Sequence, residues 1–317
     1  MRIRLLALAV AATVATACVA AAGATPRVHN GAIAYAYLGR ADYFTLYTIT
    51  AAGKHARELA HRRHASDRDP AYSPNGRRIA FVRSWKQGDL WTMTAAGRDP
   101  IRLTWTKKID ELSPAWSPDG TQIAFSVDSP AARQGIWVVA ADGHHRRQIT
   151  PGADSDPTWS PDGNQIAYAS GGAIWVVPAG GGAATQLTFP GTDPEGQPYF
   201  DGQPAWSPDG CRILFTSDRG DPAESFDQLD LWTLNVCAAG PGPNVTRVTH
   251  TPERDERDPA WSPDGRRIVY DSTGSLHGAA SSQLEVAAAS GANAHFITHS
   301  CGDCAYANLE PSWQPVR

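Results

Sequence analysis

The sequence is poor in cysteine, methionine and charge, and positive charge is not in excess. It has five Cys and two Met in 317 residues, and 28 Lys and Arg stand against 32 Asp and Glu, a net charge of −4. This balance argues against a protein that binds nucleic acid through phosphate contacts. No apolar run of about 18 residues follows position 24, which excludes a polytopic membrane protein. With 29 Gly, 24 Pro and 11 Trp, the chain is that of a folded protein rich in turns.

Residues 1–24 have the pattern of a secretory signal peptide. Arg2 and Arg4 precede an apolar stretch at 5–14, and small residues continue to Ala24. Two cleavage sites compete. Residues 15–18 resemble the lipobox of bacterial lipoproteins, in which Cys18 would become the acylated first residue, whereas cleavage near 22–24 would discard Cys18. Either way, we expect residues 25–317 to form the mature protein, exported to the periplasm, the cell surface or the medium.

One phrase recurs along the rest of the chain. The form Pro-Ala-Trp-Ser-Pro-Asp-Gly at 114–120 returns with small changes at 70–76, 157–163, 204–210 and 259–265, and a truncated copy stands at 311–315. The aromatic anchors of the copies lie 43 to 55 residues apart and are Tyr72, Trp116, Trp159, Trp206, Trp261 and Trp313. Repeats of this size are typical of propeller blades or solenoids.

Each repeat predicts a four-stranded antiparallel sheet. The Asp-Gly turn leads into an alternating strand such as 122–126, a loop precedes a second apolar strand such as 136–139, and a small-residue turn precedes a short last strand. The N-terminus supplies strands without the phrase, and the C-terminus supplies the phrase without following strands. Joining the two ends completes a sixth blade. The sequence therefore predicts an all-β, six-bladed propeller closed by its own termini.

The remaining cysteines are expected to form disulfides, because export places them in an oxidising compartment. Cys211 opens the second strand of its blade and Cys237 closes the neighbouring antiparallel strand, so a cross-strand disulfide is predicted. Cys301 and Cys304 have the spacing of a metal or redox motif. A single pair is a weak metal signal, however, and a small loop-closing disulfide is the preferred interpretation.

The repeated phrase and the Ile-Ala-Phe strand behind it resemble the repeat of the TolB-like propeller family. The resemblance covers about residues 30–317 and implies a non-enzymatic propeller whose channel mouth receives a partner protein. The separate α/β domain that precedes the propeller in TolB is not expected here, because about ten residues separate the signal from the first strand. The same repeats occur in propellers attached to serine peptidases, and no hydrolase domain follows here.

Acidic residues recur at the start of each innermost strand. Two rows stand five and three positions before the anchors, and both were expected to ring the mouth of the central channel. Such clustered carboxylates suit a hard cation such as Ca²⁺ or a basic partner segment. The alternative is that each one caps local backbone N–H groups. The candidate site residues are Asp67, Glu111, Asp154, Asp201 and Glu256 in the first row and Asp69, Asp156, Asp258 and Glu310 in the second.

Long loops are predicted on the rim opposite the Ser-Pro-Asp-Gly turns, and long loops on a rigid scaffold often carry function. Tyr199, Phe200 and Phe226 lie on them and are candidate contacts, although packing within the loops would also explain them. In the blade of Trp261, Glu285 replaces the usual Trp of the third strand, so that edge is expected to be less buried or to form a contact.

Motifs of catalysis are missing from the sequence. It contains no Gly-x-Ser-x-Gly elbow, no His-Glu-x-x-His motif and no P-loop. We therefore expect a monomeric, non-enzymatic module that binds an envelope or secreted protein or peptide. The alternative is a propeller that cleaves or binds uronate-type polysaccharides, which would place several His and Arg and a metal at the mouth. A structural envelope protein that uses its blade edges is a third hypothesis.

Overall fold

The computed structural model describes residues 29–38, 43–59, 62, 64–129, 133–193, 196–220, 228–238, 244–251, 253–276, 279–298 and 308–316. The regular secondary structure in these ranges is entirely β-strand. Within the same ranges, the chain has no helical segment with the length and apolar character that a membrane crossing needs.

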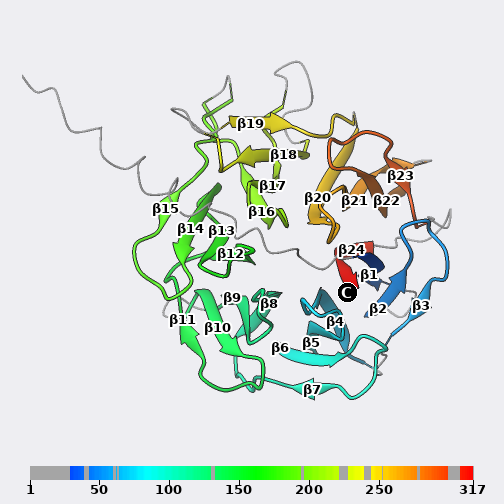
Figure 1. The fold of residues 1–317 in the computed structure, drawn as a ribbon, viewed down its shortest axis with the longest axis vertical. Coiled ribbons are helices and arrows are strands. Elements are labelled where there is room, and N and C mark those ends of the chain that lie inside the picture. The colour runs from blue at the N-terminus through cyan, green and yellow to red at the C-terminus, as the bar shows by residue number, and fades with distance from the viewer. Residues whose placement is uncertain are drawn as a thin grey trace, which may run out of the picture.

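Six sheets of four antiparallel strands stand around a central axis (Figure 1). Five of them follow the order of the chain from the innermost to the outermost strand. The first of these five sheets consists of β4 (Ser66–Tyr72), β5 (Arg78–Ser84), β6 (Gly88–Thr94) and β7 (Ile101–Arg102). The second consists of β8 (Asp110–Trp116), β9 (Gln122–Asp128), β10 (Gly135–Ala140) and β11 (Arg147–Gln148). The next sheet consists of β12 (Asp154–Trp159), β13 (Gln165–Ser170), β14 (Ala173–Pro178) and β15 (Thr185–Gln186).

The last two of the five sheets have longer strands or loops. They consist of β16 (Asp201–Trp206), β17 (Arg212–Ser217), β18 (Asp230–Asn235) and β19 (Asn244–Arg247), and of β20 (Arg254–Trp261), β21 (Arg267–Leu276), β22 (Ala279–Ala288) and β23 (His295–Phe296).

The sixth sheet joins the two ends of the described chain. The last strand, β24 (Asn308–Val316), pairs with the first, β1 (His29–Leu38), and β2 (Phe44–Ile49) and β3 (Arg57–Glu58) complete the blade. Trp313 lies opposite Ile33 and donates its indole N–H to the Gly31 carbonyl at 3.2 Å. The predicted six-bladed propeller closed by its terminal strands is confirmed.

The recurring phrase forms a tight turn held by its own side chains. In one copy, the Ser117 hydroxyl donates to Asp119 Oδ1 at 2.6 Å and accepts the N–H of Gln122 at 2.9 Å. Gly120 adopts a φ of 72°, which favours glycine. The same Ser–Asp bond recurs at Ser160, Ser207 and Ser262. The turn is therefore a structural element of these four blades.

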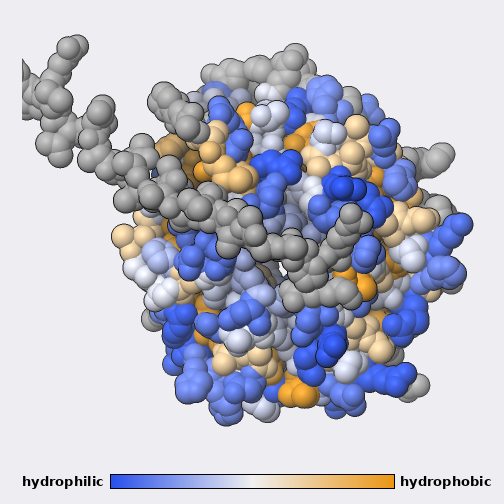
Figure 2. Space-filling model, viewed as in Figure 1, coloured by the Kyte–Doolittle hydropathy of each residue, from blue (hydrophilic) through white to orange (hydrophobic). Residues whose placement is uncertain are grey.

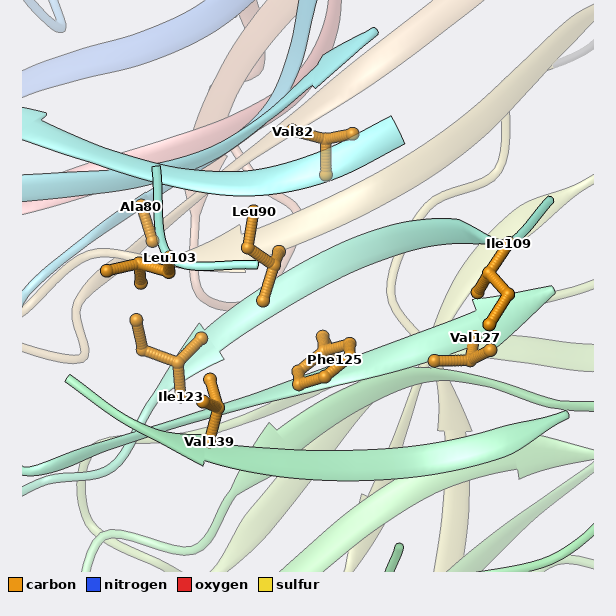
Figure 3. Packing of buried hydrophobic residues seen from close by; sticks show 9 residues of the cluster. All are labelled: Ala80, Val82, Leu90, Leu103, Ile109, Ile123, Phe125, Val127 and Val139. Atoms are coloured by element: carbon orange, nitrogen blue, oxygen red, sulfur yellow. The ribbon is translucent and has the colours of Figure 1, made fainter. Parts of the chain in front are cut away.

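The apolar core lies between neighbouring blades. Figure 3 shows one cluster in which Val82 and Leu90 of one blade pack with Ile123 and Phe125 of the next. The tryptophan anchors add hydrogen bonds across the same boundaries. Trp116, Trp159 and Trp261 donate to the carbonyls of Ala71, Ala115 and Ala205 of the preceding blades, each at 3.1 Å. Each blade is therefore stabilised mainly by its neighbours.

The predicted disulfide between Cys211 and Cys237 is present, with a Cα–Cα distance of 4.9 Å. It links the start of β17 to the residues that follow β18. Cys18, Cys301 and Cys304 lie outside the described residues, as does the signal segment 1–24.

Glu285 does not lie at an exposed edge. Its side chain is buried on β22, opposite Tyr270 on one side and Phe296 on the other. Burial raises the pKa of its carboxyl above the ordinary value, and hydrogen bonding to Tyr270 opposes that shift. The expectation of a less buried edge at this position is wrong, because the outermost strand β23 covers it.

Candidate binding site at the channel mouth

The residues three positions before the anchors share an unusual backbone conformation. All six have a positive φ, between 50° and 57°, although none is glycine. A register shift accompanies each of them, such as the one between Arg68 and Ala71 around Asp69. Such a bulge interrupts the alternation of side chains along the strand. We call the six residues the channel ring: Asp69, Ser113, Asp156, Gln203, Asp258 and Glu310.

The channel ring surrounds one cavity on the propeller axis. The cavity has a volume of about 170 Å³, and the channel ring and the proline that follows each of its members line it. The six innermost strands thus each contribute one polar side chain. In Figure 2 the described part of one face around the axis is predominantly hydrophilic, with apolar residues in small separate patches.

Hydrogen bonds connect the channel ring from blade to blade. Glu310 accepts the N–H of Asp69 at 2.6 Å, and Asp69 accepts the N–H of Ser113 at 2.7 Å. The Ser113 hydroxyl donates to Asp156 at 2.9 Å. Gln203 donates its amide N–H to Asp258 and accepts the backbone N–H of Asp258 at 3.1 Å. The carboxylates therefore bond across blade boundaries, and the alternative of caps confined to their own blades does not describe them.

The carboxyls of the channel ring are costly to ionise together. Burial, followed by the negative charges of Asp156, Asp271 and Asp69, raises the pKa of Asp258 to about 8. Burial raises the pKa of Asp156, against the effect of two serine hydroxyl donors. Burial and the nearby Asp69 raise the pKa of Glu310 well above the ordinary value. Low dielectric and like charge both disfavour the ionised form of these carboxyls. A bound cation would stabilise that form, so the carboxyls would release protons when the cation binds.

The row five positions before the anchors lies elsewhere. Asp67, Glu111, Asp154, Asp201 and Glu256 are between 0% and 7% exposed and do not line the cavity. The second row lines the cavity and the first row does not, so the prediction that both rows ring the mouth is met only by the second. The bulge breaks the alternation that would place both rows on the same face of the strand. Asn308, the last member of this row, begins β24.

Three residues of that row form buried ion pairs inside the propeller. Asp67 accepts two bonds from the Arg83 guanidinium, at 2.6 and 2.7 Å. Asp201 pairs in the same way with Arg219. Glu111 lies 2.9 Å from the guanidinium of Arg146. These carboxylates act as structural charges, because a buried carboxylate needs a paired cation or hydrogen-bond donors.

Glu256 lies next to another acid instead. Its carboxyl accepts a bond from the Thr249 hydroxyl at 3.2 Å, and Asp230 is close enough to interact with it. Burial raises the pKa of Glu256 to about 8. A hydrogen bond with Thr251 opposes this shift, and the negative charge of Asp230 adds to it. This pair lies at the boundary between the fourth and fifth repeats and is not part of the channel ring.

The loop aromatics lie on the rim with the longer loops. Phe200 is 42% exposed, and its backbone N–H donates to Asp218 at 2.6 Å, which joins two loops. Tyr199 is half-buried, and Phe226 lies outside the described residues. Sequence analysis did not single out Trp85 and Trp105, which are also exposed. Both tryptophans lie outside the repeated anchor positions and close to lysines in the sequence, and this pattern could have indicated that they are exposed.

Metal binding has no clear geometric basis in the described ranges. No three His, Cys, Asp or Glu side chains among the described residues are grouped so as to hold a metal ion. The Ca²⁺ ion predicted for the mouth therefore stays a prediction.

The fold and the cavity define the chain as a six-bladed β-propeller with a polar site on its axis. Residues 106–200 match the TolB beta propeller domain family. The fold is similar to TolB from Acinetobacter baumannii, with 22% identity, 90% of this chain and 66% of that chain covered, and a TM-score of 0.72. It is also similar to a TolB candidate from Agrobacterium tumefaciens, with 20% identity, coverage of 84% and 90%, and a TM-score of 0.64.

An oligogalacturonate lyase from Vibrio parahaemolyticus has a similar fold, with 14% identity, coverage of 80% and 71%, and a TM-score of 0.53. No curated protein matches the chain. Identities this low show the fold alone. Together, the family match of residues 106–200 and the six blades confirm the resemblance expected from the repeats, and the chain spans 66% of the Acinetobacter protein.

Proposed function

We propose that this propeller is an exported, non-enzymatic module that binds a positively charged segment of an envelope or secreted protein at the channel mouth. The channel ring is the observation that carries the proposal. It places four carboxyl groups, Asp69, Asp156, Asp258 and Glu310, around one cavity. A lysine ammonium or an arginine guanidinium entering the cavity would offset the repulsion among them.

The raised pKa values support a cationic ligand. Burial and the charges of the neighbouring acids raise the pKa of Asp258 to about 8, and the charge of Arg257 opposes that shift only in part. A bound cation lowers the pKa values of the surrounding carboxyls, so binding is coupled to the release of protons. The affinity for a basic segment should therefore increase as the pH rises through the titration range of the channel ring.

The comparisons support a protein partner and an exported location. Residues 106–200 match the TolB beta propeller domain family and two TolB proteins share the fold, and this resemblance implies a partner protein and a periplasmic location. The N-terminal signal pattern, with its two competing cleavage sites, supports export of this chain as well. We propose that the propeller acts as a monomer, with Phe200 and the neighbouring loop residues adding contacts around the mouth.

The polysaccharide-lyase alternative receives no support from this cavity. That hypothesis calls for several His and Arg side chains around a metal at the mouth. The residues that line the cavity are the six members of the channel ring and six prolines. The similarity to an oligogalacturonate lyase lies in the fold, at 14% identity.

A calorimetric titration with a short lysine peptide tests the proposal. The probe should bind the mature propeller, and a variant with Asp69, Asp156 and Asp258 all changed to Asn should bind it at least tenfold more weakly, a loss of about 1.4 kcal/mol. The matched control changes Asp99, Asp119 and Asp142 to Asn, three exposed turn acids outside the cavity. Asp119→Asn is conservative because Asn75 occupies the same turn position in another blade.

The control variant removes the same number of carboxyl groups, so it separates local binding from overall attraction. Equal weakening in both variants, or no binding of the peptide to the parent, would contradict the proposal. A Ca²⁺ titration in the same calorimeter tests the predicted ion. Capture from envelope extract with the parent and the channel-ring variant would then identify the natural partner by its selective loss.

A further inference from the structure

A second surface, on the blade formed by β4 to β7, has the opposite character. Trp85, in the loop after β5, is 43% exposed, and Trp105, in the segment after β7, is 72% exposed. Both loops lie at the end of the blade where strands β5 and β7 finish. Lys86 follows Trp85 in the sequence, Lys107 and Lys108 follow Trp105 closely, and Arg62 lies over the Trp85 ring. We call this surface the aromatic platform: Trp85, Trp105, Arg62, Lys86, Lys107 and Lys108.

Two acids, one buried and one exposed, fix the two loops of the aromatic platform together. Asp89 accepts the N–H of Thr106 at 3.0 Å and a bond from the Arg102 guanidinium at 2.6 Å. Asp110 accepts the N–H of Gly88 at 2.7 Å. Asp89 is 4% exposed, so its two bonds are shielded from water. The loops that carry the indoles are therefore preorganised, which reduces the entropy lost on binding.

Each indole has a guanidinium over its ring. Arg62 lies 5.0 Å from the ring centroid of Trp85, and Arg102 lies 5.5 Å from that of Trp105. Trp85 also packs edge-on against Trp91, at 6.2 Å between centroids. These contacts hold the rings in place from the protein side. The large exposed fractions show that much of each ring surface still meets solvent.

The charge of the aromatic platform selects an anion. Arg62, Lys86, Lys107 and Lys108 are exposed, whereas the acid between the loops, Asp89, is buried and paired. The exposed acid Asp110 uses one carboxylate oxygen on a backbone donor. A cluster of exposed cations on a chain with a net charge of −4 concentrates anionic ligands locally.

We propose that the aromatic platform is a binding site for an anionic oligosaccharide whose sugar rings carry carboxylates. The C–H faces of a pyranose ring are flat and apolar and can cover an exposed indole, while the carboxylates at the ring edge accept bonds from lysine and arginine. This site is separate from the channel ring and goes beyond the proposed function. It involves no cleavage of the ligand.

Two other occupants fit the surface less well. Anchor residues of peptide-binding sites lie in pockets that exclude water, whereas Trp105 stands 72% exposed. A membrane surface would favour exposed aliphatic side chains beside the tryptophans, and the sequence neighbours here are Lys86, Gln87, Thr106 and Lys107. Open, rigid rings flanked by cations match a saccharide better than either.

Tryptophan fluorescence titration with an α-1,4-linked oligogalacturonate tests the proposal. The parent should show saturable quenching, and Trp105→Ala should weaken binding about tenfold, because truncating an aromatic anchor costs more than 1 kcal/mol. The double variant K107A/K108A should bind more weakly and lose most of the salt dependence seen with the parent. Phe296→Ala removes an exposed aromatic from another blade and is the matched control, with no expected change.

Three parallel ligands make the test decisive. Equal binding of a fully methyl-esterified oligomer would overturn the requirement for carboxylates, and equal binding of polyaspartate or of anionic vesicles would overturn the saccharide. No saturable change with the oligogalacturonate would overturn the site. The channel-ring variant D69N/D156N/D258N should bind the saccharide as the parent does, so failure of this proposal is distinguishable from failure of the proposed function. Circular dichroism of every variant verifies its fold.

Discussion

Replacing Arg83 with Met tests whether the Asp67 row is structural. The guanidinium of Arg83 forms two bonds to Asp67, at 2.6 and 2.7 Å, and lies 5.1 and 5.0 Å from the ring centroids of Phe81 and Trp91. The side chains of the ion pair are only 3% and 2% exposed. Methionine fills much of the same space but supplies no charge and no donor, so Asp67 would be left buried without the guanidinium that balances its charge.

The expected cost is large for a single substitution. Removing one partner of a buried ion pair typically destabilises a protein by about 3–5 kcal/mol. The lost cation–π contacts add on the order of 1 kcal/mol. A second change, Asp67→Asn, removes the orphaned charge, so the double variant should recover part of the loss. By contrast, Arg257→Met breaks an exposed pair with Asp255 and should cost less than about 1 kcal/mol.

Urea unfolding followed by tryptophan fluorescence measures these differences in the free energy of unfolding. A cost below about 1 kcal/mol for Arg83→Met would refute the assignment of Asp67 as a buried structural charge. So would a double variant less stable than Arg83→Met alone. Binding of the lysine peptide should be unchanged in correctly folded Arg83→Met protein, because neither residue lines the cavity.

Two further predictions concern stability. Changing Cys211 and Cys237 to Ser opens a loop with a sequence separation of 26, which should lower the free energy of unfolding by roughly 3.5 kcal/mol, and identical urea midpoints would contradict this. Between about pH 4 and about pH 8, folded Asp258 retains a proton that the unfolded chain releases, so stability should fall as the pH rises. Asp258→Asn removes this contribution. The stability of the variant relative to the parent should therefore increase with pH, and parallel pH profiles of the two proteins would show that Asp258 has no such role.

The blades were predictable because a repeated sequence demands a repeated structure. Six near-copies of one phrase gave the period, and alternating apolar residues such as Ile123 and Phe125 gave the strands that pack between blades. The disulfide followed from the same reasoning, since strand order placed Cys211 beside Cys237. These inferences needed only local patterns and the geometry of antiparallel sheets.

The candidate site was only partly predictable, and the reason lies in the backbone. In a regular strand, Asp67 and Asp69 would lie on the same face, since side chains alternate with a period of two. The positive φ at Asp69 and the register shift beside it break that alternation, so Asp69 lines the channel while Asp67 is buried against Arg83. No propensity of Asp, Ser, Gln or Glu reveals such a bulge in advance.

The position of Glu285 was misjudged for a different reason. The absence of a tryptophan suggested an exposed edge, but β23 covers the residue and Tyr270 lies opposite it. Burial depends on the neighbouring strands as well as on the residue type, and the sequence does not show how the strands that carry Tyr270 and Phe296 enclose this side chain.

Closure of the sixth blade links the binding site to completion of the chain. Glu310 lies on β24, the last strand, and its carboxylate accepts the N–H of Asp69 on β4, 241 residues earlier in the sequence. The cavity is therefore unfinished until β24 has paired with β1. A chain whose final strand is not yet in place, during synthesis or after proteolysis near the C-terminus, would present five sides of the site instead of six. Ligand binding at the channel would then distinguish finished molecules from unfinished ones.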